Sequence, residues 1–156
     1  MDQTGAFLSE TLPRLREAEV ALHNGDVGPR LAMWSHGDPV TLFGGVMGGS
    51  GWAEIEPIFH RLGASFSDCQ SYEHEVIAAG ANDDLAYTVA FEHTTASINR
   101  GQPMEYVLRV TTVFRREDGA WKVVHRHADP VASPGASELV QLLSSGPKSA
   151  RARPAT

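Results

Sequence analysis

The stretch from Met104 to Asp129 most constrains the fold, because it holds two strand-like runs around an Asp-Gly turn. Both runs are rich in β-branched and aromatic side chains. Between them, Asp118-Gly119 is a strong short-range signal for a β-hairpin. A third run of the same kind, residues 85–98, comes first and is joined through Asn99-Arg100-Gly101-Gln102. Three long consecutive runs with polar residues on one side predict an antiparallel sheet.

The turns decide which side chains share a face of this sheet. A two-residue turn at Arg100-Gly101 places Glu92 opposite Arg109, an acid–base pair that sheets favour. The second turn allows two registers: a two-residue Asp118-Gly119 turn, or a three-residue loop with Gly119 in a bulge. A slip of one residue moves the whole last strand to the other face. We favour the bulged loop because it separates apolar from polar side chains more cleanly.

The bulged register predicts a core face with one buried cation and a polar-aromatic face that meets another sheet. With the other register, Arg126 exchanges places with His125 and His127. The predicted core face consists of Leu108, Val110, Thr112, Phe114, Val124 and Ala128 with Tyr87, Val89, Phe91, His93 and Arg126. The other face consists of Glu92, Arg109, Thr111, Val113, Trp121, Val123, His125 and His127.

The remaining chain predicts helices before the sheet and a short extension after it. Apolar residues at three- and four-residue steps predict a helix over residues 4–24, with Pro13 in its first turn or at a kink. A short helix follows from Pro29 to about Trp34, then a strand at 38–43, a helix at 51–63 and a strand at 71–79. We expect the glycine-rich residues 44–51 to form a flexible rim.

Helices followed by antiparallel strands predict an α+β fold, with a curved sheet wrapped around the N-terminal helices and a conical pocket between them. We expect residues 1–132 to form this domain. Residues 133–156 should form an extension with one or two helical turns at 137–143 and then a disordered tail.

Composition excludes several classes of protein. A net charge of −6 over 156 residues argues against a general nucleic-acid binder. One cysteine allows no intrachain disulfide and no zinc cluster. No apolar run is long enough to span a membrane, and the N-terminus lacks the pattern of a secretory leader. We therefore expect a cytoplasmic protein.

With these residues in view, the sequence resembles the nuclear-transport-factor-2-like superfamily, in its SnoaL-like and ketosteroid-isomerase-like branch. The resemblance covers residues 4 to about 130 and lies in the first helix, residues 34–44, the strand start at 85–87, residues 108–111 and residues 115–127. It implies the cone-shaped fold, which hosts isomerases, dehydratases, cyclases, epoxide hydrolases and non-catalytic modules. A ketosteroid isomerase has a carboxylate base near the end of the first strand, where residues 43–45 offer none.

The last hairpin is also similar to that of the association domain of calcium/calmodulin-dependent kinase. Matching Asp118-Gly119 and Trp121 without gaps puts Thr112 and Ala128 where that domain has pocket arginines. The match therefore implies that Arg126 lies on the pocket side.

Three residues are candidates for catalysis. His36 could move a proton, with Asp38 holding its tautomer; alternatively, His36 is a loop histidine bonded to backbone. Arg126 on an apolar face needs an anionic partner. It is either a clamp for a developing negative charge or one half of an internal salt bridge, for example to Asp38 or Glu54.

Other polar and aromatic residues are candidates for shaping a pocket, or are core groups satisfied by hydrogen bonds. His125-x-His127 lacks the further ligands of a metal site, and the glycine-rich segment lacks the lysine of a phosphate-binding loop, so we expect no metal and no cofactor. The candidate substrate-binding residues are Trp34, Tyr87, Phe91, His93 and Thr112.

Two hypotheses for function follow. The first is a cofactor-independent lyase, isomerase or cyclase acting on a small apolar compound with a carbonyl or carboxylate group. The second is a non-catalytic ligand-binding or dimerisation module. In both, we expect a homodimer formed through the outer face of the sheet.

Overall fold

The computed structural model describes residues 2–145, which form four helices and six strands. In chain order these are α1 (Gln3–Leu22), α2 (Gly28–Met33), β1 (Thr41–Gly44), β2 (Met47–Ser50), α3 (Trp52–Ser65), β3 (Phe66–Ala81), β4 (Leu85–Ile98), β5 (Met104–Glu117), β6 (Ala120–Val131) and α4 (Ala136–Ser144).

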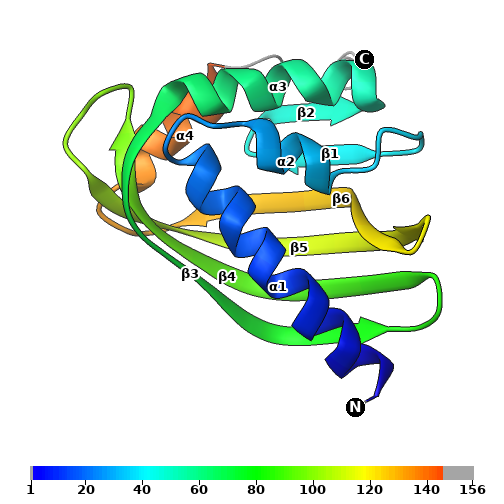
Figure 1. The fold of residues 1–156 in the computed structure, drawn as a ribbon. Coiled ribbons are helices and arrows are strands. Elements are labelled where there is room, and N and C mark those ends of the chain that lie inside the picture. Colours follow the sequence, from blue (N-terminus) through cyan, green and yellow to red (C-terminus); the bar gives the residue numbers. More distant parts are fainter. Residues whose placement is uncertain (1, 146–156) are drawn as a thin grey trace, which may run out of the picture.

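The six strands form one curved sheet in the order β2-β1-β6-β5-β4-β3. Neighbouring strands are antiparallel except β1 and β6, which are parallel. Figure 1 shows the long strands curving past α1, which lies across their concave face, while α2 and α3 gather at the β1–β2 end. The predicted α+β cone is confirmed.

The apolar stripe of α1 explains its position against the sheet. Asp2 caps the helix by accepting a hydrogen bond from the Gly5 amide at 2.7 Å. Phe7 packs edge-on against Phe114 and Trp121, with ring centroids 5.0 and 5.2 Å apart. Pro13 lies inside the helix rather than in its first turn.

The glycine-rich segment is not the flexible rim that the sequence predicts, because β2 pairs with β1 along its whole length. Gly45, with φ of +60°, makes the turn between them. A Cβ on Gly49 would lie 3.1 Å from Ile55 Cγ1, so glycine lets α3 pack closely on this hairpin.

The predicted register of β4 is wrong by one residue. Phe91, not Glu92, lies opposite Arg109. Asn99 and Arg100 both have left-handed φ values, 51° and 63°, and Pro103 has no amide hydrogen to start a ladder, so the connection is longer than a two-residue turn. The odd-numbered residues of β4 therefore face outward, and Glu92 faces inward.

The second hairpin combines parts of both predicted registers. Asp118 and Gly119 have φ values of 50° and 77°, as a two-residue type I′ turn requires, so the three-residue loop is wrong. A bulge between Val113 and Phe114 then shifts the pairing, with Val124 as the extra residue on β6. Trp121 and Val123 are consequently buried.

Beyond the bulge, the faces of β6 agree with the prediction. Arg126 lies opposite Thr112 and is buried, as is Ala128. His125 and His127 lie on the outer face.

A helix, α4, is present where helical turns were expected, and three of its leucines are buried. The predicted disordered tail lies outside the described residues, and the division at residue 132 stays a prediction. None of the described helices is long and apolar enough to cross a membrane.

Candidate functional site

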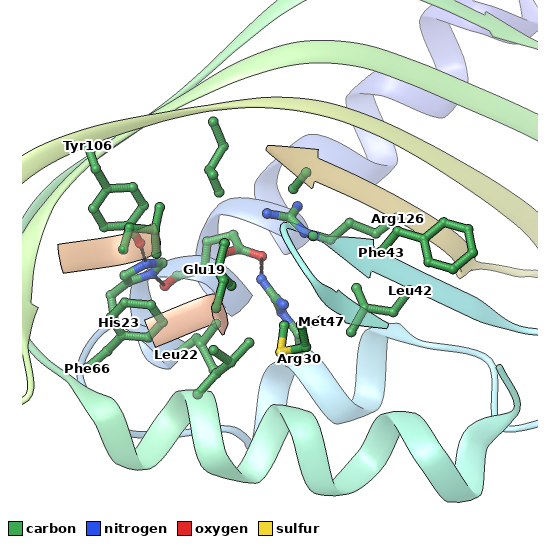
Figure 2. A pocket seen from close by; sticks show the side chains of 16 residues that line it. Glu19, Leu22, His23, Arg30, Leu42, Phe43, Met47, Phe66, Tyr106 and Arg126 are labelled. Atoms are coloured by element: carbon green, nitrogen blue, oxygen red, sulfur yellow. Dashed lines mark hydrogen bonds and ion pairs between the residues drawn. The ribbon is translucent and has the colours of Figure 1, made fainter. Parts of the chain in front are cut away.

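The main inner cavity lies between α1, the β1–β2 hairpin, the concave face of the sheet and α4 (Figure 2). Its volume is about 50 Å³. Its wall is mostly apolar, and its charged residues are Glu19, Arg30 and Arg126. The apolar side chains that line it include Leu22, Leu42, Met47, Phe66, Leu108, Leu139 and Leu143.

The first charged pair joins the two N-terminal helices. Arg30 of α2 donates a hydrogen bond to Glu19 of α1, and both side chains are almost completely buried. The Arg30 guanidinium also lies over the Phe59 ring, 5.0 Å from its centroid. The pair thus fixes α2 against α1 beside the cavity.

The second pair joins two strands that are not neighbours in the sheet. Arg126 Nη1 and Nη2 donate to Glu92 Oε2 and Oε1 at 3.0 and 2.7 Å, a two-pronged arrangement. Burial alone would raise the pKa of Glu92, but Arg126 and His74 together outweigh this effect and hold the pKa well below its usual range. His74 Nδ1 lies 3.4 Å from Glu92 Oε2 and 3.0 Å from the Tyr72 hydroxyl, which extends the network to β3.

Arg126 was predicted to be either a clamp for negative charge or one half of an internal salt bridge, and in the structure it forms a salt bridge. Its partner is Glu92 and not Asp38 or Glu54. The prediction missed Glu92 because the one-residue register error had placed it on the outer face. Arg126 also lines the cavity. Its pairing with Glu92 therefore does not remove it from the site.

His23 and Tyr106 form a neutral polar pair on the cavity wall. His23 Nδ1 lies 2.7 Å from the Glu19 carbonyl oxygen, which can only accept, so Nδ1 carries the hydrogen and Nε2 accepts from the Tyr106 hydroxyl. Burial lowers the pKa of His23, although the Glu19 carboxylate opposes this shift. Burial, together with Glu19, raises the pKa of Tyr106.

Sequence reasoning missed Glu19 and His23. A signal was available, because these two residues lie four apart within the apolar stripe that includes Leu15 and Leu22. A polar residue on a buried helix stripe needs a partner.

A smaller cavity of about 20 Å³ adjoins the first and shares Glu19, Arg30 and Arg126 with it. Trp34 and Thr112, two of the predicted substrate-binding residues, line this smaller cavity. The Thr112 hydroxyl is buried and has no hydrogen-bond partner among the described residues.

The structure does not bring His36 and Asp38 to these cavities. The exposed His36 ring stacks on Trp52 at 4.0 Å and 14°, and its Nε2 lies 2.8 Å from the Leu31 carbonyl oxygen. Asp38 accepts a hydrogen bond of 3.0 Å from the Trp52 amide at the start of α3. Both residues therefore have structural partners near the start of α3, and their catalytic roles stay predictions.

Tyr87, Phe91 and His93 lie on the outer face of β4, so their predicted position in the inner pocket is wrong. Tyr87 is 44% exposed, and His93 pairs with Glu75 at 3.0 Å. The cause is again the β4 register. Within residues 2–145, no three His, Cys, Asp or Glu side chains come together in a way that could hold a metal ion.

Known proteins with a similar sequence or structure identify the fold. The sequence profile of the SnoaL-like domain matches residues 15–133. A candidate dehydratase of the NTF2-like family from Streptomyces avermitilis is 19% identical with a TM-score of 0.66, over 83% of this chain and 99% of that one. A cystatin-like protein of unknown function from Nostoc punctiforme is 18% identical with a TM-score of 0.66, over 86% and 98% of the two chains.

A third similar structure is a candidate calcium/calmodulin-dependent protein kinase type II association domain from Thiobacillus denitrificans. It is 16% identical with a TM-score of 0.59, over 78% of this chain and 95% of that one. A search of curated proteins finds no match. These likenesses establish the fold, which is of the small-molecule-binding type. The chain belongs to the SnoaL-like domain family, and it shares the fold of NTF2-like proteins.

Proposed function

We propose that this domain binds a small, largely apolar molecule in the inner cavity. The observation that carries the proposal is the composition of the cavity wall. Leucine, methionine and phenylalanine side chains surround a single group of charged residues, Glu19, Arg30 and Arg126. Ligand sites commonly combine an apolar lining with a few polar groups that orient the ligand.

The small volume of the cavity indicates that part of its wall must move before a ligand can enter. A cavity of about 50 Å³ holds only a few atoms, whereas drug-sized ligands occupy roughly 300–1,000 Å³. The α4 helix contributes Leu139 and Leu143 to the wall and contacts the body mainly through apolar side chains. A ligand therefore enters by displacing α4.

Binding can be tested with N-phenyl-1-naphthylamine, a neutral dye that fluoresces in apolar surroundings. Ala128→Leu adds carbon atoms to a residue that lines the cavity, so this variant should bind the dye less tightly than the parent. Ala32→Leu, at an exposed position on α2, is the matched control. Equal dye binding by both variants would mean that the dye does not bind in this cavity.

A second candidate function is acid–base catalysis without a cofactor, as in a lyase, isomerase or cyclase. The observation that favours it is His23, a buried imidazole on the cavity wall whose lowered pKa keeps it neutral. Because its Nε2 accepts a hydrogen bond from the Tyr106 hydroxyl, His23 would take up a proton from a substrate through that hydroxyl. Arg126 would then steady negative charge that develops on a carbonyl oxygen.

Proton abstraction can be detected as deuterium uptake by 2-octanone in heavy water, followed by mass spectrometry. Loss of uptake in His23→Gln would assign the step to the inner cavity. Loss in His36→Gln alone would instead restore the predicted role of His36 at the far end of α2. Uptake no faster than in buffer leaves binding as the function.

We further propose that two chains associate through the outer face of the sheet. Five of the seven large hydrophobic side chains that are exposed within residues 2–145 lie on this face: Phe43, Ile77, Leu85, Tyr87 and Val89. Arg109 and Asp129 lie opposite each other on the same face. A patch carrying both charges can complement itself across a two-fold axis.

A further inference from the structure

The charges buried inside the cone are balanced. Among residues 2–145, the carboxylates and guanidinium groups that are buried are those of Glu19 and Glu92, and of Arg30 and Arg126. Burial keeps His23 neutral by lowering its pKa. At a pH where histidines are neutral, the set therefore has no net charge before any ligand enters.

The four groups alternate in sign, and all of them except Glu92 line the cavity. Arg30 pairs with Glu19, and Arg126 pairs with Glu92. Figure 2 shows the Glu19 carboxylate between the guanidinium groups of Arg30 and Arg126. Glu19 also helps Glu92 to raise the pKa of Arg126, against the lowering effect of burial. Each cation thus already has a nearby carboxylate.

We propose that this cavity selects neutral molecules with a carbonyl or hydroxyl oxygen over carboxylates of the same size. The proposal rests on the binding function proposed above and names its ligand class. A bound carboxylate would add one negative charge to a balanced, buried set, and an uncompensated charge in such surroundings is strongly unfavourable. It would also have to compete with Glu19 and Glu92 for their arginines.

A neutral oxygen meets none of these obstacles. Glu92 engages two of the five N–H donors of Arg126, and the others remain able to donate to an oxygen. A ligand oxygen accepts such a hydrogen bond without displacing Glu92. The ion pair then stays intact while the ligand is held.

The smaller cavity supports the same ligand class independently. Thr112 lies directly across from Arg126 in the β5–β6 ladder, and its buried hydroxyl has no partner within residues 2–145. About 20 Å³ beside these two residues holds one water-sized group. The space suits the single oxygen of an alcohol or ketone and is too small for both oxygens of a carboxylate.

The test compares 1-octanol with octanoate, which have the same number of carbon atoms, as competitors of N-phenyl-1-naphthylamine. Measured at about pH 8, where histidines are ordinarily neutral, octanol should compete at least about tenfold more strongly. Equal or stronger competition by octanoate overturns the proposal. If the dye binds to the cavity but neither compound displaces it, the ligand class is wrong while binding stands; if the dye itself does not bind, the proposed function fails first.

A charge-changing variant provides the sharper comparison. Glu19→Gln keeps the side-chain shape but gives the buried set a net positive charge, so the preference for octanol should fall by about tenfold or reverse. Glu17→Gln, exposed on the same helix, is the matched control and should keep the parent preference. An unchanged preference in a folded Glu19→Gln protein contradicts the charge-balance explanation, and the parent comparison remains decisive if this variant does not fold.

Discussion

Arg126 illustrates how one buried guanidinium depends on a single carboxylate. Its two hydrogen bonds to Glu92 cross the interior between β6 and β4, and both side chains are almost fully inaccessible. Removing the charge of one partner leaves the other buried and unpaired, whereas removing both leaves an apolar interior. We therefore expect the pair to contribute more to the specificity of strand arrangement than to net stability.

This difference predicts the outcome of a double-mutant cycle. Arg126→Met should lower the free energy of unfolding by about 3–5 kcal/mol. Glu92→Met combined with Arg126→Met should recover most of that loss, because no unpaired charge remains. Urea denaturation of the parent, both single variants and the double variant measures the coupling. A double variant as unstable as Arg126→Met would show that the cost comes from packing instead.

The same cycle bears on catalysis. Arg126→Met by itself cannot identify a catalytic arginine, since Glu92 would be disturbed at the same time. Loss of deuterium uptake in a stably folded double variant is the cleaner sign that the guanidinium acts on a substrate.

His23 predicts how stability changes with pH. Its pKa is lowered in the folded protein from a value of 6.5, so the unfolded chain takes up a proton at a higher pH than the folded chain. The free energy of unfolding should therefore fall as the pH drops below about 6.5. The charged or titratable groups that face the ring are Glu19, Arg30 and Tyr106.

The prediction can be checked by thermal unfolding between about pH 7.5 and pH 5.5. His23→Gln should lose less stability across this range than the parent does. Its slope should not vanish, because burial and the neighbouring His127 lower the pKa of His125 in the same sense. His60→Gln, exposed on α3, serves as the control; a parent-like slope in His23→Gln would exclude His23 as the source.

At the scale of elements, turns decided how far the sequence could predict the structure. The Asp118-Gly119 hairpin and the inward face of β5 followed from alternation and turn chemistry. The inward face of Arg126 was predicted through a three-residue loop that is wrong, and the bulge at Val124 places Arg126 on the same face. The position of Glu92 did not follow from these signals, because two left-handed residues lengthen the connection between β4 and β5 by an amount that no local pattern reveals. The bulge at Val124 was equally hidden, since it depends on how Trp121 and Val123 pack under α1.

The α4 helix carries its own prediction, because Leu139 is 2% exposed whereas the adjacent Val140 is 48% exposed. If α4 closes the cavity, Leu139→Ala should speed dissociation of N-phenyl-1-naphthylamine by about tenfold or more, since one apolar contact of about 2 kcal/mol or more is lost from the closed state. Val140→Ala should release the dye at the parent rate. Stopped-flow fluorescence measures both rates, and identical rates would mean that α4 is a fixed wall.

At the scale of the whole molecule, the cone presents two surfaces of different character. The inner one is closed by α4 and holds the paired charges. The outer one contains a groove of about 350 Å³ bordered by Ile77, Val89, Phe91 and Arg109. The predicted residues Tyr87, Phe91 and His93 belong to this outer surface rather than to the inner pocket. In the dimer that we propose, they would lie near the contact between the two chains.

If the outer surface joins two chains, Val89→Asp should convert a dimer into a monomer. A charge at the centre of an apolar interface would be desolvated without a partner. Sedimentation velocity distinguishes the monomer from the dimer. Ala32→Asp, at an exposed position on α2, is the control. A monomeric parent protein, or a dimeric Val89→Asp protein, would refute this arrangement.

The parallel contact between β1 and β6 also sets an order of events during synthesis. Thr41 and His125 are neighbours in the sheet but lie 84 residues apart in the chain. A ribosome releases the β1–β2 hairpin long before β6 exists, so the hairpin must wait with one side unpaired. The wall that encloses the inner cavity is therefore assembled only when the last strand arrives, and a nascent chain exposes those apolar side chains to chaperones until then.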